Sequence, residues 1–129
     1  MGSAAADSDR SGTTDLFLTH FYADTNTLYL NRSDPSGMFF EDATRISRLG
    51  PPSRLSLGFG VAALDADNDG WQDLFVANGH IDDRTWAENA QPYRMSPQFY
   101  RNDGAAQFRE TSGTAGAYFQ KQWLGRGVA

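Results

Sequence analysis

A nine-residue acidic segment occurs twice in the chain, at residues 7–15 and again, 58 residues later, at residues 65–73. Each copy has aspartates at its first, third and ninth positions, a glycine at its sixth, and Leu-Phe directly after it. Further similarities follow at offsets of 67 to 71 residues: Asn31 with Asn102, Phe40 with Phe108, and Gly58–Ala62 with Gly125–Ala129. Internal repeats of this length are typical of solenoids, propellers and other arrays.

Both copies predict short strands, and neither contains a convincing helix. The expected strands are Gly60–Leu64, Asp73–Asn78, Gln98–Arg101 and Gln107–Thr111 in the second copy, and Asp15–His20, Thr27–Asn31 and Met38–Asp42 in the first. Asn102-Asp103-Gly104 is a hairpin turn signal between the last two strands. Because four-stranded units repeated radially form a β-propeller, the sequence predicts an all-β fold of about two four-stranded antiparallel propeller blades.

The repeat boundaries divide the chain into four parts. We expect residues 1–5 to be a cloning-derived or disordered start, residues 6–58 the first blade, residues 59–112 the second blade with a loop insertion at 79–96, and residues 113–129 the start of a third repeat. Closed propellers typically have about 4–8 blades. The sequence therefore predicts a partial propeller, or one that closes by association with other chains.

The second acidic segment predicts a calcium-binding loop. Calcium takes about 6–8 oxygen ligands, and a tight loop supplies them by presenting alternate side chains to the ion. Gly70, at the sixth position, permits the sharp turn. An EF-hand is excluded because its twelfth position requires a bidentate glutamate, whereas the residue here is Val76. The predicted calcium ligands are Asp65, Asp67, Asp69, Asp73 and the backbone carbonyl of Trp71.

The first acidic segment predicts a second, weaker calcium loop. Its candidate ligands are Asp7, Asp9, Ser11, Thr13 and Asp15. Ser11 replaces the carboxylate of the fifth position, so this loop carries less negative charge than the second one. For both loops, an alternative is an Asp- and Gly-rich turn whose side chains bond only to their own backbone.

Two further features suggest contacts with other molecules. Trp86 and Tyr93 lie in the insertion at 79–96, which we expect to contact a partner, although packing within the loop would also explain these aromatic residues. Asn31-Arg32-Ser33 matches an N-glycosylation sequon at Asn31, although in a short hairpin such a match can also arise by coincidence.

The pattern Asp-x-Asp-x-Asp-Gly-x-x-Asp-Leu-Phe-Val resembles the FG-GAP/VCBS repeat of integrin-α-like propellers. Three further stretches are similar to the bacterial proteins related to cartilage acidic protein, which often carry an ASPIC/UnbV segment: Asp73–His80, Phe99–Asn102 and Leu124–Ala129. No ASPIC/UnbV segment is present in this chain. The resemblance implies a calcium-stabilised propeller module of a secreted, periplasmic or cell-surface protein, which mediates adhesion or binding to an extracellular protein or glycan.

Composition and motifs limit the other function classes. A formal net charge of −5 argues against binding to nucleic acid, and no apolar run approaches the roughly 20 residues of a membrane-inserting helix. No catalytic motif is visible, so the sequence predicts that the chain is not an enzyme. The alternative hypothesis is a structural subunit that self-associates through open blade edges into a ring or filament. A lyase or hydrolase on a propeller scaffold ranks below both.

Overall fold

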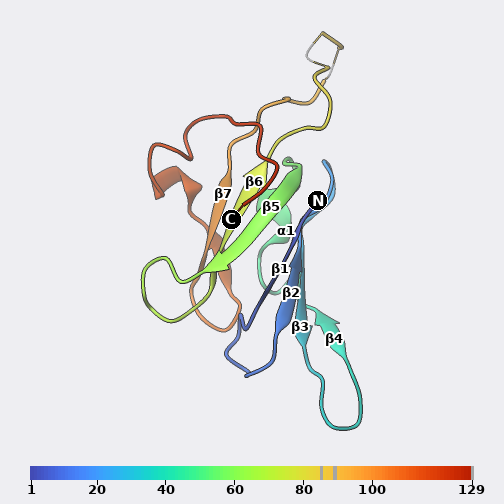
Figure 1. Cartoon of the computed structure of the whole chain (residues 1–129), viewed down its shortest axis with the longest axis vertical. Helices are drawn as coiled ribbons and strands as arrows, with labels where there is room; N and C mark the ends of the chain where they lie inside the picture. The colour runs from blue at the N-terminus through green and yellow to red at the C-terminus, as the bar shows by residue number, and fades with distance from the viewer. Residues whose placement is uncertain (85, 89, 129) are drawn as a thin grey trace.

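Two four-stranded antiparallel sheets make up the computed structural model, which describes residues 1–84, 86–88 and 90–128 (Figure 1). The first sheet contains β1 (Ser3–Ala6), β2 (Asp15–Leu18), β3 (Thr27–Asn31) and β4 (Phe40–Asp42). The second contains β5 (Gly58–Leu64), β6 (Asp73–Asn78), β7 (Gln98–Asn102) and β8 (Phe108–Glu110). In each sheet the strands pair in chain order, which confirms the predicted all-β fold with two four-stranded blades.

The start of the chain differs from the expectation. Ser3–Ala6 forms β1 and pairs with Leu18–Asp15 of β2, so the first sheet begins within residues 1–5, which were expected to be cloning-derived or disordered. The reason is that β1 occupies the inner position beside β2, where only small residues fit. Gly2 is so close to the carbonyl oxygen of Phe59 that no Cβ could be accommodated.

Two short helical turns also differ from the expectation of a purely β chain. Helix α1 (Gly50–Ser53) has proline at its first turn, where the missing N–H of proline costs nothing. A single 3₁₀ turn, η1 (Ser112–Thr114), follows β8. After η1, the described residues up to 128 form turns and irregular backbone, with one bridge between Met95 and Trp123.

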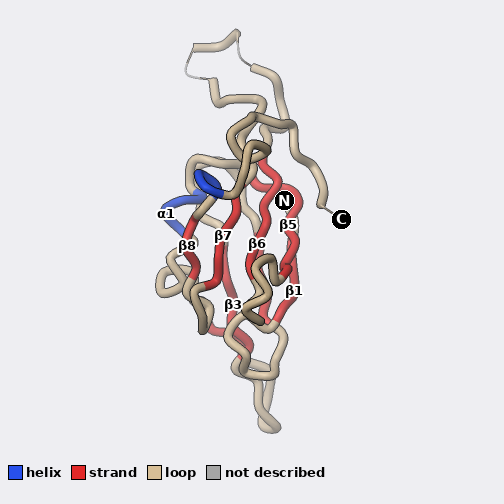
Figure 2. Tube along the Cα trace, turned by 90° about the vertical axis from the view of Figure 1, so that its left-hand side faces the viewer, coloured by secondary structure: helices blue, strands red, loops and turns tan. Residues whose placement is uncertain are grey.

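The hydrophobic core lies between the two sheets, whose strands run along the long axis of the molecule (Figure 2). Alternating residues of each strand point to one face, so each sheet presents one apolar row to the other. The core includes Phe17, Leu28 and Leu30 from the first sheet, and Leu74, Val76 and Tyr100 from the second. One shared cluster means that neither sheet buries its apolar face alone.

The inner strand β5 is crowded on both sides, as its small residues predict. A Cβ atom on Gly58 would lie 2.6 Å from the Cβ of Thr19, and one on Gly60 would lie 2.6 Å from the carbonyl carbon of Gly127. Real Cβ atoms do not approach other atoms so closely. Glycine at these positions therefore lets Thr19, which follows β2, and the C-terminal segment approach β5 closely.

A long loop joins β6 to β7, as predicted for the insertion at 79–96. An isolated bridge between Gly79 and Arg94 closes its base. Residues 85 and 89 of this loop, and residue 129 of the expected third repeat, lie outside the described residues. None of the helices in the part of the chain that the structure describes has the length and apolar character to cross a membrane.

Candidate metal centres

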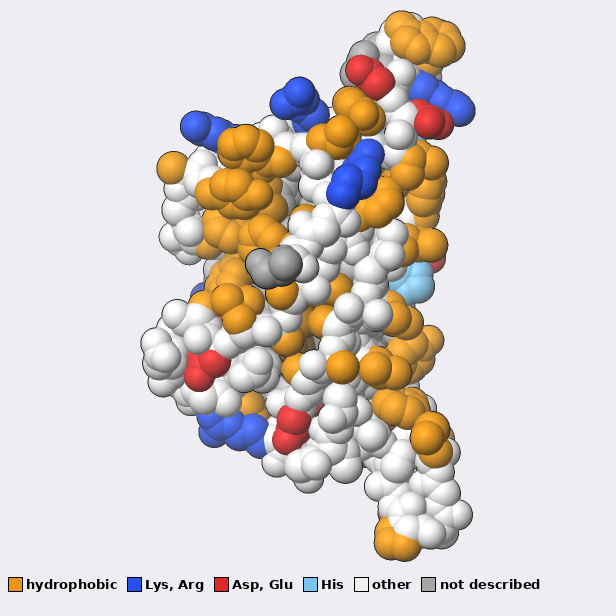
Figure 3. All heavy atoms as spheres, in the orientation of Figure 1, with side chains coloured by type: hydrophobic (Ala, Val, Ile, Leu, Met, Phe, Trp, Pro, Cys, Tyr) orange, Lys and Arg blue, Asp and Glu red, His pale blue; other side chains and the backbone are white. Residues whose placement is uncertain are grey.

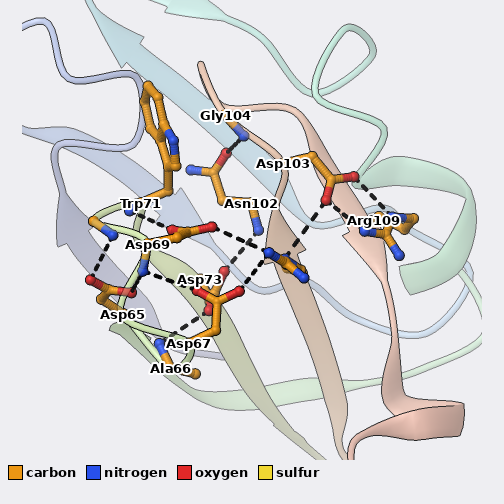
Figure 4. A network of polar contacts seen from close by, with 12 residues as sticks. Asp65, Ala66, Asp67, Asp69, Trp71, Asp73, Asn102, Asp103, Gly104 and Arg109 are labelled. Atoms are coloured by element: carbon orange, nitrogen blue, oxygen red, sulfur yellow. Dashed lines mark hydrogen bonds and ion pairs between the residues drawn. The ribbon is translucent and has the colours of Figure 1, made fainter.

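The second acidic loop joins β5 to β6 and brings three of its predicted ligands together. Asp65, Asp67 and Asp69 each offer a carboxylate oxygen within 4.8 Å of the other two. The turn is held by the Asp65 side chain, which accepts hydrogen bonds from the backbone N–H groups of Asp69 (3.1 Å) and Gly70 (2.9 Å) (Figure 4). Gly70 has φ of +83°, which confirms the need for glycine at the sixth position.

The ninth-position aspartate, Asp73, is buried and lies outside this cluster. Its carboxylate accepts hydrogen bonds from the backbone N–H groups of Asn102 (2.8 Å) and Ala66 (3.2 Å), so it ties the loop to strand β7. Burial raises the pKa of Asp73 above its ordinary value despite these two donors, and the charges of Asp67 and Asp69 raise it further. A cation beside this carboxylate would relieve both effects.

Trp71, the predicted carbonyl ligand, also connects the two loops. The guanidinium carbon of Arg10, a residue of the first loop, lies 4.0 Å from the centroid of the Trp71 ring. Arg10 donates hydrogen bonds to the carbonyl oxygens of Gly70 (3.0 Å) and Asp69 (2.9 Å). The fifth- and sixth-position carbonyls of the second loop therefore bind the first loop, while the predicted calcium ligand is the carbonyl of Trp71, the seventh residue.

The first acidic loop joins β1 to β2 and also brings three carboxylates together, although not at the same three positions. Asp7, Asp9 and Asp15 offer carboxylate oxygens within 4.8 Å of one another. Asp7 accepts hydrogen bonds from the backbone N–H groups of Ser11 and Gly12, each at 2.9 Å. The hydroxyl oxygens of Ser11 and Thr13 lie 2.8 Å apart. Of the five predicted ligands, three therefore meet in one cluster, and the other two pair with each other.

Asp15 anchors its loop through the same kind of backbone contacts as Asp73, but unlike Asp73 it also belongs to the three-carboxylate cluster. It is buried, and it accepts hydrogen bonds from the backbone N–H groups of Ser8 (2.8 Å) and Asn31 (2.9 Å). Burial raises its pKa too, and the neighbouring Asp9 and Asp7 raise it further. In both blades the ninth-position aspartate thus fastens the loop to the third strand of its own sheet.

Each loop has an arginine partner that was not predicted. Arg101 of β7 lies 2.6 Å from Asp67, and Arg32, which follows β3, lies 2.5 Å from Asp9. Burial opposes ionisation of Asp9, but the bonds from Arg32 and Ser11 outweigh it and lower its pKa. An arginine next to an asparagine recurs at the end of the third strand of each repeat, at residues 31–32 and 101–102. This recurrence could have indicated the two arginine partners from the sequence.

The two loops are linked across the blades by Arg10, which predicts a measurable effect. Arg10→Ala removes two hydrogen bonds and one cation–π contact to the second loop, and we expect it to lower the free energy of unfolding by about 1 kcal/mol, because the contacts are exposed. Urea denaturation measures this loss. The matched control is Arg45→Ala, an exposed arginine outside both loops, which should stay within about 0.5 kcal/mol of wild type. Equal losses in the two variants would contradict the link.

The remaining candidate residues lie elsewhere. Trp86 is 84% exposed in the loop between β6 and β7, while Tyr93 of the same loop is half-buried and its carbonyl accepts the His80 N–H at 2.8 Å. The Asn31 side chain, the predicted glycosylation acceptor, donates to the carbonyl of Thr14 and accepts from the N–H of Ser33. The amide nitrogen to which a glycan would attach is therefore already hydrogen-bonded within the blade.

Two four-stranded antiparallel sheets, each with an acidic loop between its first and second strands, define a β-propeller-like repeat protein. The chain belongs to the FG-GAP-like repeat family, whose model matches residues 7–76. This match runs from the first acidic loop to strand β6 and confirms the FG-GAP part of the expected resemblance. The comparison with curated proteins and the comparison with solved structures found no match.

Proposed function

We propose that the chain is a non-enzymatic calcium-binding repeat module in which calcium stabilises the loop of each blade. The observation that carries the proposal is that the loop between the first and second strands of each sheet brings three aspartate carboxylates within 4.8 Å of one another. The three stand at the first, third and fifth positions of the second loop, and at the first, third and ninth positions of the first loop. One arginine beside each loop offsets only part of this charge. Close carboxylates repel one another, and a divalent cation removes the repulsion.

The donor atoms suit calcium. Asp65, Asp67, Asp69 and the Trp71 carbonyl would hold the ion in the second loop, and Asp7, Asp9 and Asp15 would hold it in the first. All these donors are oxygens, which calcium prefers. Several of the carboxylate oxygens already accept backbone N–H groups. A carboxylate oxygen has a further lone pair for a cation, so the same hydrogen bonds that support the turn also orient the ligands.

The alternative of a plain Asp-rich turn makes a different prediction in solution. Extracellular calcium modules bind with Kd of about 10⁻⁴–10⁻³ M. A site with Kd of about 0.1 mM would stabilise the fold by about 1.4 kcal/mol at about 1 mM calcium. We therefore expect EGTA to lower the melting temperature by about 5 °C, and calorimetry to show tighter binding at the second loop. Identical melts in calcium and EGTA, with no calorimetric binding, would contradict the proposal.

Matched variants assign the signal to each loop. The double substitution Asp65→Asn/Asp67→Asn should remove the tighter binding event, and Asp7→Asn/Asp9→Asn the weaker one. Asp24→Asn removes an exposed carboxylate outside both loops and should leave both events unchanged. Loss of both events in the Asp24→Asn variant would show that net charge, rather than the loops, governs binding.

We place this module in a secreted, periplasmic or cell-surface protein that mediates adhesion or binds an extracellular protein or glycan. What supports this assignment is the family membership together with the exposed Trp86, since an exposed aromatic ring can stack on a sugar or anchor a protein. The similarity of Asp73–His80 and Phe99–Asn102 to the bacterial relatives of cartilage acidic protein supports membership of that branch of the family.

A further inference from the structure

Equivalent residues of the two blades differ in exposure in a systematic way. Phe17, Leu28 and Leu57 of the first repeat are buried, the first two of them in the core between the sheets. Their repeat equivalents, Phe75, Phe99 and Leu124, lie on the outward side of the second blade, which we call face A. Leu57 is 0% exposed whereas Leu124 is 38% exposed. Face A therefore repeats an apolar surface of the first blade that the second blade covers.

The opposite surface shows the reverse relation. Leu74, Val76, Tyr100 and Phe108 of the second blade are buried against the first blade. Their equivalents in the first blade are Leu16, Leu18, Tyr29 and Phe40, which form its outward side and which we call face B. Leu74 is 2% exposed whereas Leu16 is 37% exposed. Within each chain, one face of the first blade packs on one face of the second. The two remaining faces repeat these packed faces, but no other blade of the chain covers them.

We propose that face A of one copy binds face B of a second copy, in the way that the first blade packs on the second within the chain. The contact between copies would have the geometry of the contact between β1–β4 and β5–β8 within one chain, because the same residue types recur on the free faces. This inference goes beyond the proposed calcium binding and does not depend on it.

Face A has room for this contact. It contains a hollow of about 850 Å³ between Ala62, Phe75, Phe99 and the C-terminal segment. Phe119 of that segment packs on Phe75 and Phe99, with ring centroids 5.7 and 6.0 Å apart. The equivalent segment of the first repeat, residues 43–57, lies between the blades with Leu49 and Leu57 buried. The C-terminal segment is therefore part of the contact surface, where Figure 3 shows apolar side chains gathered at the upper left.

Both faces carry charged residues at their edges. Arg101 and Arg109 pair across β7 and β8 and line the hollow on face A, where they also bind Asp67 and Asp103 of their own blade. Asp42 pairs with Tyr29 across β3 and β4, so its exposed carboxylate lies on face B. A contact of unlike faces is heterologous, and it produces a closed ring or an open filament. With two blades in each copy, a ring of about 4–8 blades contains two to four copies.

Light scattering coupled to size exclusion, run over a range of concentrations in calcium and in EGTA, tests the proposal. We expect the mass to rise with concentration from the 14.2 kDa monomer to between two and four times that value, or to larger filaments. A mass of 14.2 kDa at every concentration would overturn the proposal, because faces A and B would then not bind each other. The calcium experiment can fail without changing this result, so the two failures are distinguishable.

Variants show which surfaces meet. Leu16→Glu blocks face B and Phe75→Glu blocks face A, so each variant alone should stay monomeric. An equimolar mixture should form a dimer and nothing larger, because one intact face of each kind remains. Leu124→Glu replaces Phe75→Glu if the latter unfolds, as judged by circular dichroism. The control Met38→Glu changes an exposed residue outside both faces and should assemble as wild type. A mixture that stays monomeric, or a Leu16→Glu variant that assembles normally, would overturn the proposal.

Discussion

Replacing Asp73 by alanine is expected to lower the free energy of unfolding by about 3 kcal/mol, even in EGTA. The buried carboxylate accepts the backbone N–H groups of Ala66 and Asn102. Alanine leaves both donors without an acceptor, and the buried N–H of Asn102 alone costs about 1–3 kcal/mol. The N–H of Ala66 is only partly buried, so its loss costs less. The loss is a large part of the roughly 5–15 kcal/mol that stabilises a typical domain. Urea denaturation in EGTA measures it, since chelation removes any contribution from calcium.

Asp69→Ala is the matched control for this prediction. Asp69 belongs to the same loop, but it is exposed, and its carboxylate accepts one backbone N–H, that of Trp71. We expect a loss of about 1 kcal/mol or less in EGTA. Asp15→Ala, the equivalent change in the first blade, should resemble Asp73→Ala because Asp15 binds Ser8 and Asn31 in the same way. Similar stabilities for the Asp73→Ala and Asp69→Ala variants would mean that the ninth-position aspartate has no anchoring role.

The second large effect is expected for Asn102→Ala. The side chain of Asn102 is buried, and it donates to the carbonyls of Ser8 (2.9 Å) and Gln72 (3.2 Å) and accepts the N–H of Gly104 (3.0 Å). Because Ser8 belongs to the first blade, this one amide joins both acidic loops. Its removal leaves the Gln72 carbonyl and the Gly104 N–H without this partner, while the Ser8 carbonyl keeps only the N–H of Ala106. We expect the free energy of unfolding to fall by about 3 kcal/mol. Denaturant unfolding gives the loss, and hydrogen exchange should be faster in residues 7–15.

The repeat itself provides the control for Asn102. Asn31 occupies the same position in the first blade, but it is partly exposed, so water can replace its bonds to Thr14 and Ser33. We expect Asn31→Ala to cost about 1 kcal/mol or less. If both alanine variants lost equal stability, the contact between Asn102 and Ser8 across the blades would be unimportant.

Much of the fold could be predicted from local pattern. The acidic loops, the Leu-Phe runs after them and the recurring Asn residues gave seven of the eight strands and the correct all-β class. The strand β1 was not predicted because Ser3–Ala6 has no apolar alternation of its own and is held by pairing with β2 and by contact with β5. The backbone of α1 was missed for a similar reason, since four residues carry no periodic signal.

The candidate site was predicted only in part. Spacing placed the carboxylates of Asp65, Asp67 and Asp69 in one turn, because a loop of nine residues leaves few conformations open to them. It did not separate the roles of the carboxylates, and the structure shows Asp73 as a buried anchor rather than a member of the three-aspartate cluster. Arg10, Arg32 and Arg101 reach the loops from other segments, and sequence distance carries no information on such contacts.

Local sequence pattern specifies the acidic loops, their repetition and the two-blade plan, because these depend on residue types at short spacing. The tertiary structure alone decided that the blades share one core and that Arg10 and Asn102 join their loops. It also decided which apolar rows are covered and which remain on faces A and B. These properties depend on how one sheet packs on the next. Tyr29 and Tyr100 occupy the same repeat position, and they differ in burial because only Tyr100 has another sheet packed against it.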